Sequence, residues 1–328
     1  MRTVVQQLAI GVIAGLIVPT FIVVAHLLDS EPGSSGSPED RSTPSFLYSS
    51  AVPSDASVEA NVLLAAGDIA GCGSRSDEET ALVLDGVPGL IATLGDNAYP
   101  RGTAREYEEC FAPSWGRHKD RIRPVPGNHD YFTPGAAGYF GYFGPAAGEP
   151  GKGYYTYELN GWRIYALNSK CSRIGGCEAG SPQYRWLADQ LKINRASCTL
   201  AYWHEPPFGA GLENPRAEAV RPWVTLLYEA GADIILSASA HNYQRLARLD
   251  PTGETDDKFG IRYFVVGTGG AGLHPVDASF SGLEVWNDSV HGILRLTLDE
   301  DGYTWQFLPA DGEFTDAGTG ECHEAPPA

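Results

Sequence analysis

Short apolar runs recur between residues 61 and 241, and a polar residue comes soon after each of them. Each run has the four to seven residues expected of a buried strand. The runs are Asn61–Gly67, Leu90–Leu94, Ile122–Val125, Thr199–Trp203 and Asp233–Leu236. The polar residues that follow are Asp68, Asp96, Asn128, His204 and His241. The pattern therefore predicts five buried strands, each of which ends close to a polar side chain.

Stretches with helical periodicity separate these strands. They are Ser76–Leu84, Thr103–Phe111, Gln183–Ile193 and Arg216–Ala230. Strands that alternate with helices indicate a largely parallel sheet covered on both faces. Ligands bind where the carboxyl ends of such strands emerge, so we expect the five polar residues to meet at one edge.

The later segments have a different pattern. Gly153–Leu159 and Trp162–Asn168 flank an Asn-Gly pair, which is typical of a hairpin turn. Ile261–Val266, Gly292–Leu298 and Tyr303–Leu308 also have the character of strands. These segments predict a second, mixed sheet packed on the first within one domain, residues 59–328 including a C-terminal tail.

The N-terminal residues differ from the rest of the chain. Leu8–Leu28 contains no Asp, Glu, Lys or Arg and is long enough to cross a bilayer as one helix. Residues 1–28 are therefore interpreted as a transmembrane signal anchor or as a signal peptide cleaved after Ala25. Because Arg2 precedes the segment, both interpretations place the following domain outside the cytoplasm, either tethered by its N-terminus or secreted.

Residues 29–58 are expected to form a flexible linker. Sixteen of these thirty residues are Ser, Pro or Gly. Such a segment buries too little apolar surface to offset its ordering entropy.

The net charge bears on the class of binding partner, and the cysteine content bears on disulfide bonding. The net charge is −18, from 41 acidic against 23 basic residues, which makes nucleic acid an unsuitable partner. Six cysteines in a protein outside the cytoplasm favour disulfides, although a zinc site competes with this interpretation. The favoured pairs are Cys171–Cys177, Cys198–Cys322 and Cys72–Cys110, and the sequence alone leaves other pairings open.

The polar strand ends, together with Tyr99, offer the ligands that first-row metal ions prefer. Two cations about 3.5 to 4 Å apart can neutralise a phosphate ester and turn a bound water into hydroxide at neutral pH. One carboxylate must then bridge the two ions. Asp96, in a tight Gly-Asp turn, is the natural candidate.

The motifs GDI, GDNAY, GNHD, WH and AHNY occur in this order from Gly67 to Tyr243. In order and spacing they resemble the calcineurin-like metallophosphoesterases, and GDNAY looks like the purple acid phosphatase branch, here of a bacterial, exported kind. The resemblance spans about residues 61–310. It implies a four-layer αββα sandwich, in which two mixed sheets are flanked by helices. It also implies hydrolysis of phosphate esters by a metal-bound hydroxide, with monoesters favoured over diesters.

The resemblance also implies roles for individual residues. The first metal ion would bind Asp68, Asp96, Tyr99 and His241, because Tyr99 replaces the histidine that most of the superfamily has two residues after Asp68. The second ion would bind Asp96, Asn128 and His204, together with a histidine two residues before His241. His129 would contact the phosphate, with Asp130 holding its ring. Asn97, Tyr243 and Glu205 are further candidate substrate contacts.

One position departs from the family pattern. Ser239 stands where the second ion's last histidine is expected, and a hydroxyl is a much poorer ligand than imidazole. Two ions, iron with zinc, manganese or a second iron, are therefore expected, or one ion alone. The two hypotheses are an active hydrolase of small phosphate esters and a catalytically impaired domain that binds metal or phosphate. A nuclease is disfavoured by the acidic charge, and the sequence does not give the oligomeric state.

Overall fold

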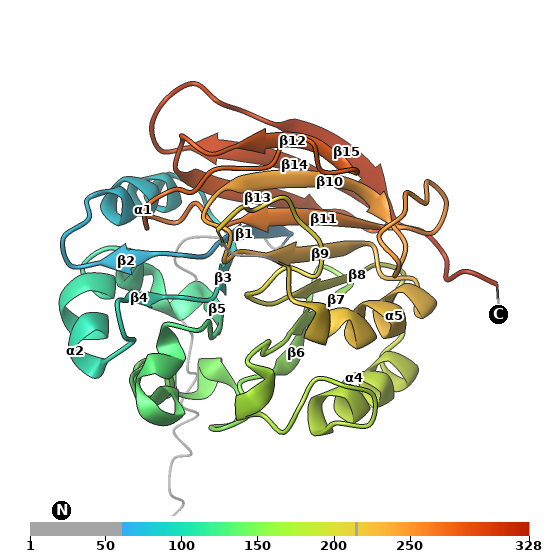
Figure 1. Ribbon diagram of the computed structural model, residues 1–328, viewed down its shortest axis with the longest axis horizontal. Coiled ribbons are helices and arrows are strands. Elements are labelled where there is room, and N and C mark those ends of the chain that lie inside the picture. Colours follow the sequence, from blue (N-terminus) through green and yellow to red (C-terminus); the bar gives the residue numbers. More distant parts are fainter. Residues whose placement is uncertain (1–60, 214–215, 328) are drawn as a thin grey trace, which may run out of the picture. The chain divides into compact units, whose positions relative to one another are not determined.

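A computed structural model describes residues 61–213 and 216–327 (Figure 1). The predicted N-terminal segment, residues 1–28, and the linker, residues 29–58, lie outside the described residues and stay predictions. Within the described ranges, no helix is both long enough and apolar enough to cross a bilayer.

The first sheet has six strands in the order β15-β14-β13-β1-β3-β5. Its parallel half consists of β1 (Val62–Ala66), β3 (Leu90–Leu94) and β5 (Ile122–Val125). Its antiparallel half consists of β13 (Gly292–Leu298), β14 (Gly302–Pro309) and β15 (Ala317–Glu321). Since β1 pairs with β13 in antiparallel fashion, the sheet is mixed.

The second sheet has seven strands in the order β12-β10-β11-β9-β8-β7-β6. The strands are β6 (Tyr155–Leu159), β7 (Trp162–Ala166), β8 (Thr199–Tyr202), β9 (Ile234–Ser237), β10 (Tyr243–Leu249), β11 (Ile261–Val266) and β12 (Leu283–Asn287). The predicted hairpin joins β6 to β7 through Asn160 and Gly161, whose φ angles are 49° and 82°. Positive φ at both turn residues gives the twist that a two-residue hairpin needs.

The division of strands between the sheets differs from the expectation. The five strands that precede the polar residues do not share one sheet: β1, β3 and β5 lie in the first and β8 and β9 in the second. Alternation of strands and helices gives local connectivity but does not reveal where the chain leaves one sheet to start another. Here the β6–β7 hairpin starts the second sheet. The carboxyl ends of β1 and β3 in the first sheet lie close to that of β8 in the second.

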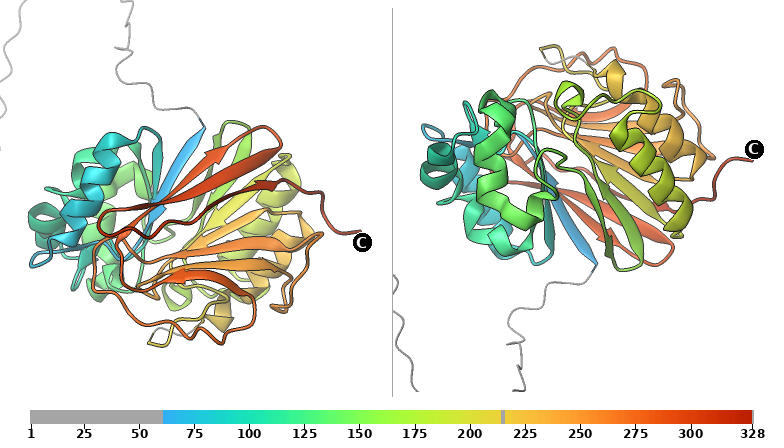
Figure 2. Two further views of the ribbon diagram at one scale, coloured as in Figure 1. Left: turned by 90° about the horizontal axis from the view of Figure 1, so that it is seen from above. Right: turned by 90° about the horizontal axis from the view of Figure 1, so that it is seen from below.

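Helices cover the outer faces of the two sheets. They are α1 (Ser76–Gly86), α2 (Ala104–Glu106), the π-helix Tyr107–Phe111, α3 (Ala137–Phe143), α4 (Pro182–Ile193) and α5 (Arg221–Glu229). The 3-10 helices are Trp115–Arg121, Asp130–Phe132, Pro134–Ala136, Gly144–Ala147, Cys171–Arg173 and Glu218–Val220. Figure 2 shows the sheets between the helices of the N-terminal half and helices α4 and α5.

Two apolar cores explain these layers. The larger core includes β1, β3 and β13 of the first sheet and β8, β9 and β11 of the second. The smaller core packs α4 and α5 on the outer face of the second sheet, through Leu187, Trp223 and Leu227. The predicted α/β fold with two mixed sheets and flanking helices is therefore confirmed.

Three disulfides join the six cysteines as predicted. The pairs are Cys72–Cys110, Cys171–Cys177 and Cys198–Cys322. They leave no free thiol, so the competing zinc site has no cysteine ligand. The last pair fastens the C-terminal tail to the start of β8, across 124 residues of sequence.

Because β1 lies in the larger core, truncating one of its side chains should destabilise the protein. Leu64→Ala removes a fully buried side chain, so the free energy of unfolding should fall by about 2–5 kcal/mol. Leu82→Ala, on α1, is the matched control because Leu82 is 57% exposed, and its effect should stay within about 0.5 kcal/mol. Urea unfolding measures both values, and equal losses would contradict the layer arrangement.

Candidate metal centre

The polar residues predicted from the strand ends gather where the two sheets meet. Asp68 follows β1, Asp96 follows β3 and His204 follows β8. One ligand atom of each of these three side chains lies within 4.8 Å of the others. Residues from both sheets therefore contribute to one cluster.

The backbone at this cluster adopts conformations that most residues avoid. Asp68, Asp96, Ser239 and His241 have φ angles of 58°, 49°, 63° and 52°. The left-handed region is unfavourable for residues with a Cβ atom, and such conformations persist only where the surroundings enforce them. In this protein they turn the chain sharply after β1, β3 and β9.

One group of side chains converges on the Tyr99 hydroxyl. Tyr99 Oη lies 3.0 Å from Asp68 Oδ1, 3.2 Å from Asp96 Oδ2 and 3.2 Å from His241 Nε2. His241 Nε2 is also 3.4 Å from Asp68 Oδ1. These four residues, called here the first ligand group, are the set predicted for the first ion.

A second ligand group consists of Asp96, Asn128 and His204. His204 Nε2 lies 3.3 Å from Asp96 Oδ2 and 3.2 Å from Asn128 Oδ1. Asp96 Oδ2 therefore belongs to both groups. This is the position that a bridging carboxylate must take between two ions.

Backbone carbonyls fix the tautomers of the histidines. The Nδ1 atom of His204 lies 2.8 Å from the Leu94 carbonyl oxygen, and that of His241 lies 2.7 Å from the Gly272 carbonyl oxygen. A carbonyl oxygen only accepts hydrogen bonds, so Nδ1 must carry the proton in both rings. Each Nε2 then faces the cluster and is the atom that can bind a metal ion once it has lost its own proton.

The cluster has an excess of buried negative charge. Burial lowers the pKa of His204, but the carboxylates of Asp96 and Asp68 outweigh this effect and raise it to about 10. Burial alone would raise the pKa of Asp96, yet the charge and hydrogen bond of His204 hold it below its usual value. Asp68 Oδ2 is buried without a hydrogen-bond partner among the described residues. Carboxylates in such surroundings are suited to cations, so the residues fit bound metal ions.

Glycines allow the ligands to approach this closely. A Cβ atom on Gly127 would lie 2.2 Å from Asp96 Oδ1, and one on Gly267 would lie 2.6 Å from Asp68 Oδ2. Any larger residue would displace a carboxylate from the cluster.

Comparison with known proteins agrees with this geometry. The family model described as calcineurin-like phosphoesterase matches residues 51–243, more than half of the chain. The chain belongs to this family. No curated protein sequence matches it.

Solved structures with similar folds have low sequence identity to this phosphoesterase. They include a purple acid phosphatase from yellow lupin (TM-score 0.61, 15% identity), GAP50 of Plasmodium (0.57, 12%) and PhoD (0.54, 11%). The matches cover 79%, 81% and 79% of this chain and 53%, 89% and 68% of the respective structures. The chain thus spans about half the length of the lupin enzyme, and at such identities the likeness establishes the fold alone.

His129 of this phosphoesterase lies at the open side of the cluster. Its ring packs between Tyr99 and Phe132, with centroid distances of 4.4 and 4.7 Å. Its Nδ1 lies 2.7 Å from the carbonyl oxygen of Pro100, and its Nε2 lies 3.9 Å from Asp96 Oδ2. The ring is therefore held by Pro100 and presents Nε2 towards the ligands.

Asp130 lies in a different place from the one expected. Its buried carboxylate accepts hydrogen bonds from the Gly127 amide (2.8 Å), the Asn97 side chain (3.1 Å) and the Tyr107 hydroxyl (2.5 Å). Burial, with the charge of Asp96, raises its pKa to about 6. Asp130 thus holds the Gly127 amide, Asn97 also donates to the Val125 carbonyl, and the Pro100 carbonyl holds the His129 ring.

The other candidate contacts also have definite positions. Tyr243 is fully buried and donates its hydroxyl proton to Asp316, so it belongs to the core between the sheets. The Glu205 carboxylate contacts Ser169 and Lys170. Ser239 is only 8% exposed and lies two residues before His241 on the turn after β9.

Several residues outside the predicted ligand set support the ligands. The His274 ring stacks on that of His241 at 4.3 Å, and Gly272 and Pro100 contribute through carbonyl groups. Every residue has a backbone carbonyl, so the residue type does not show which carbonyl will hold a ligand. The glycine-rich stretch before His274 is the sequence feature that indicates a close approach of backbone there.

The shared position of Asp96 makes a prediction about metal content. Asp68→Asn should weaken only the first ligand group, whereas Asp96→Asn should reduce the binding of both ions, because it alters the oxygen common to the two groups. Elemental analysis of metal per chain measures the difference. The control is Asp120→Asn on an exposed 3-10 helix, which should leave metal content unchanged. If Asp96→Asn retains full metal content, Asp96 does not bridge.

Proposed function

We propose that this phosphoesterase hydrolyses small phosphate monoesters, with diesters as a second substrate class, in a metal-dependent reaction. The observation that carries the proposal is the convergence of two ligand groups on Asp96 Oδ2. When bound there, two metal ions would neutralise the phosphate and acidify a water molecule. The ligand set supports iron paired with zinc, manganese or a second iron, since Tyr99 supplies a phenolic oxygen to the first group.

We assign His129 the role of contacting the phosphate or the leaving group. Because Nδ1–H donates a hydrogen bond to the Pro100 carbonyl oxygen, Nε2 is the atom that can exchange a proton with the ester oxygen. The side chain is 26% exposed, so a substrate can reach it, whereas Asp96 beside it is only 2% exposed. Asp130 and Asn97 support the loop that carries His129.

An aryl phosphate assay with added iron, zinc or manganese tests this function. The wild-type chain should turn over the ester, and removal of metal by a chelator should abolish turnover. His129→Ala should lower kcat by about 10²–10⁴-fold with unchanged metal content. His323→Gln, in the C-terminal tail, is the control and should behave as wild type. No turnover with any of these metals would refute the proposal.

Ser239 supports a second candidate function, a catalytically impaired domain that binds metal or phosphate. The second ligand group offers only Asp96, Asn128 and His204, since Ser239 occupies the turn position that precedes His241 by two residues. An ion held by three protein ligands binds more weakly than one held by four.

Restoring the expected ligand distinguishes the two functions. Ser239→His combined with Ala238→Gly should raise the content of the second metal ion, and with it the turnover, if the missing ligand limits the site. Both quantities are measured on the same preparation, with Ala238→Gly alone as control. An increase in neither would show that the serine is not limiting.

We also propose that the domain works outside the cytoplasm, either tethered through residues 1–28 or secreted. The three disulfides support this location, since thiols stay reduced in the cytoplasm. The net charge of −18 argues against nucleic acid as a partner. Recovery of the protein solely from the cytoplasmic fraction would contradict this assignment.

A further inference from the structure

The segment after β7 lies beside the second ligand group. Asn168 donates a side-chain hydrogen bond of 2.8 Å to the hydroxyl of Tyr131, which is two residues beyond His129. Ser169 and Lys170 contact Glu205, which directly follows the ligand His204. The segment therefore bridges the two loops that carry Asn128 and His204.

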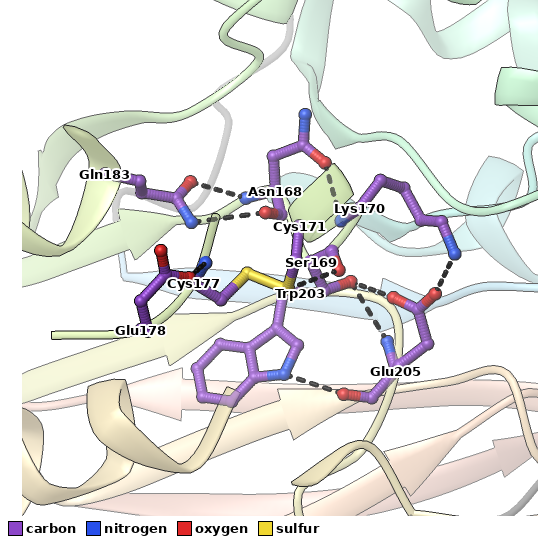
Figure 3. The surroundings of a disulfide bond; sticks show 9 residues. All are labelled: Asn168, Ser169, Lys170, Cys171, Cys177, Glu178, Gln183, Trp203 and Glu205. Carbon is purple, nitrogen blue, oxygen red and sulfur yellow. Dashed lines mark hydrogen bonds and ion pairs between the residues drawn. A yellow bond between two sulfur atoms is a disulfide. The ribbon is translucent and has the colours of Figure 1, made fainter. Parts of the chain in front are cut away.

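Several interactions hold this segment in place (Figure 3). The Asn168 backbone exchanges two hydrogen bonds with the Gln183 side chain, at 2.9 and 3.1 Å. The Cys171 amide donates to the Ser169 carbonyl at 2.9 Å, and Cys171 is joined to Cys177 by a disulfide. Residues 168–171 are thus fixed from both sides, and Lys170 starts from a rigid backbone.

Lys170 and Glu205 form an ion pair with limited solvent access. Their side chains are 23% and 16% exposed, and Ser169 contacts the second carboxylate oxygen. Both oxygens of Glu205 are therefore engaged, which leaves the carboxylate poorly placed to act as a metal ligand. Figure 3 shows Lys170 reaching over Ser169 to meet Glu205.

The ammonium group of Lys170 retains capacity for a further ligand. It carries three N–H donors. Among the described residues, Glu205 is the one hydrogen-bond partner of Nζ. A phosphate oxygen can therefore be bound while the ion pair with Glu205 keeps the ammonium oriented. Charge-assisted hydrogen bonds of this kind are strong, particularly where solvent is partly excluded.

We propose that Lys170 binds the substrate's terminal phosphate beside the second ligand group, oriented by Glu205. The inference rests on the proposed function and adds a substrate-binding residue to it. A fixed cation here supplies positive charge at the half of the centre where Ser239 replaces a ligand. It favours the dianionic phosphate of a monoester over the single charge of a diester.

Binding of inorganic phosphate to the manganese-loaded full chain tests this assignment by calorimetric titration. Lys170→Gln should weaken phosphate binding by about tenfold or more, and Lys170→Arg should retain most of the affinity. Lys258→Gln is the matched control, because Lys258 is exposed in the turn at the far end of β10 from His241. Manganese content should be equal in all four proteins.

Each outcome decides the proposal. Phosphate affinity of Lys170→Gln within twofold of wild type would overturn the role of Lys170. A loss of manganese in that variant would also overturn it, because Lys170 would then act through the metal ligands. If the wild-type chain hydrolyses aryl phosphate while Lys170→Gln binds phosphate normally, this inference alone fails. If the wild-type chain neither hydrolyses the ester nor binds phosphate, the proposed function fails with it.

Discussion

The carboxylate of Asp96 is the point on which the architecture of this phosphoesterase depends. One oxygen faces Tyr99 and His204 together, and the other accepts the His129 amide at 2.7 Å. The group is almost completely buried, and a buried carboxylate is costly unless cations and donors surround it. Strands from both sheets deliver those partners, so the junction of the sheets and the candidate metal centre are one structural feature.

A frame of backbone groups holds the side chains around Asp96. The carbonyls of Leu94, Pro100 and Gly272 each orient one histidine and come from the end of β3 and from two separate loops. The left-handed turns at Asp68, Asp96 and His241 add strain that packing must overcome. A chain keeps such costs where precise positioning is useful, which agrees with a site whose ligands must stay in place before metal binds.

The two ligand groups are unequal. In the first group, three side chains surround the Tyr99 hydroxyl. In the second, Ser239 stands where a histidine is expected, on the turn that also carries His241. On the side of the second group, a disulfide-fixed segment brings the Lys170–Glu205 ion pair next to His204. In a chain with a net charge of −18, this partly buried lysine is a cation that Glu205 holds in a fixed position. The proposed role of Lys170 sets this cation beside the group in which Ser239 replaces the expected histidine.

The sequence by itself predicted most of the buried strands and the polar residues that follow them, and it favoured the disulfide pairs that the structure contains. Polar residues after apolar runs are a local pattern, and β3, β5, β11 and β13 have the predicted bounds, since most of their residues are buried and apolar. β10, β12 and β15 were not predicted. The exposed fractions along β12 and β15 explain why no apolar run marks them.

Only the tertiary structure decided which sheet each strand joins, because strand pairing depends on contacts between residues distant in sequence. The same holds for the support of the ligands. Asp130 looked like the partner of His129 because the two are adjacent, yet the carbonyl of Pro100 holds that ring. A carbonyl is present in every residue, so its role is set by the path of the chain and not by residue type. The proposed role of Lys170 likewise depends on its ion pair with Glu205, which lies 35 residues away in the sequence.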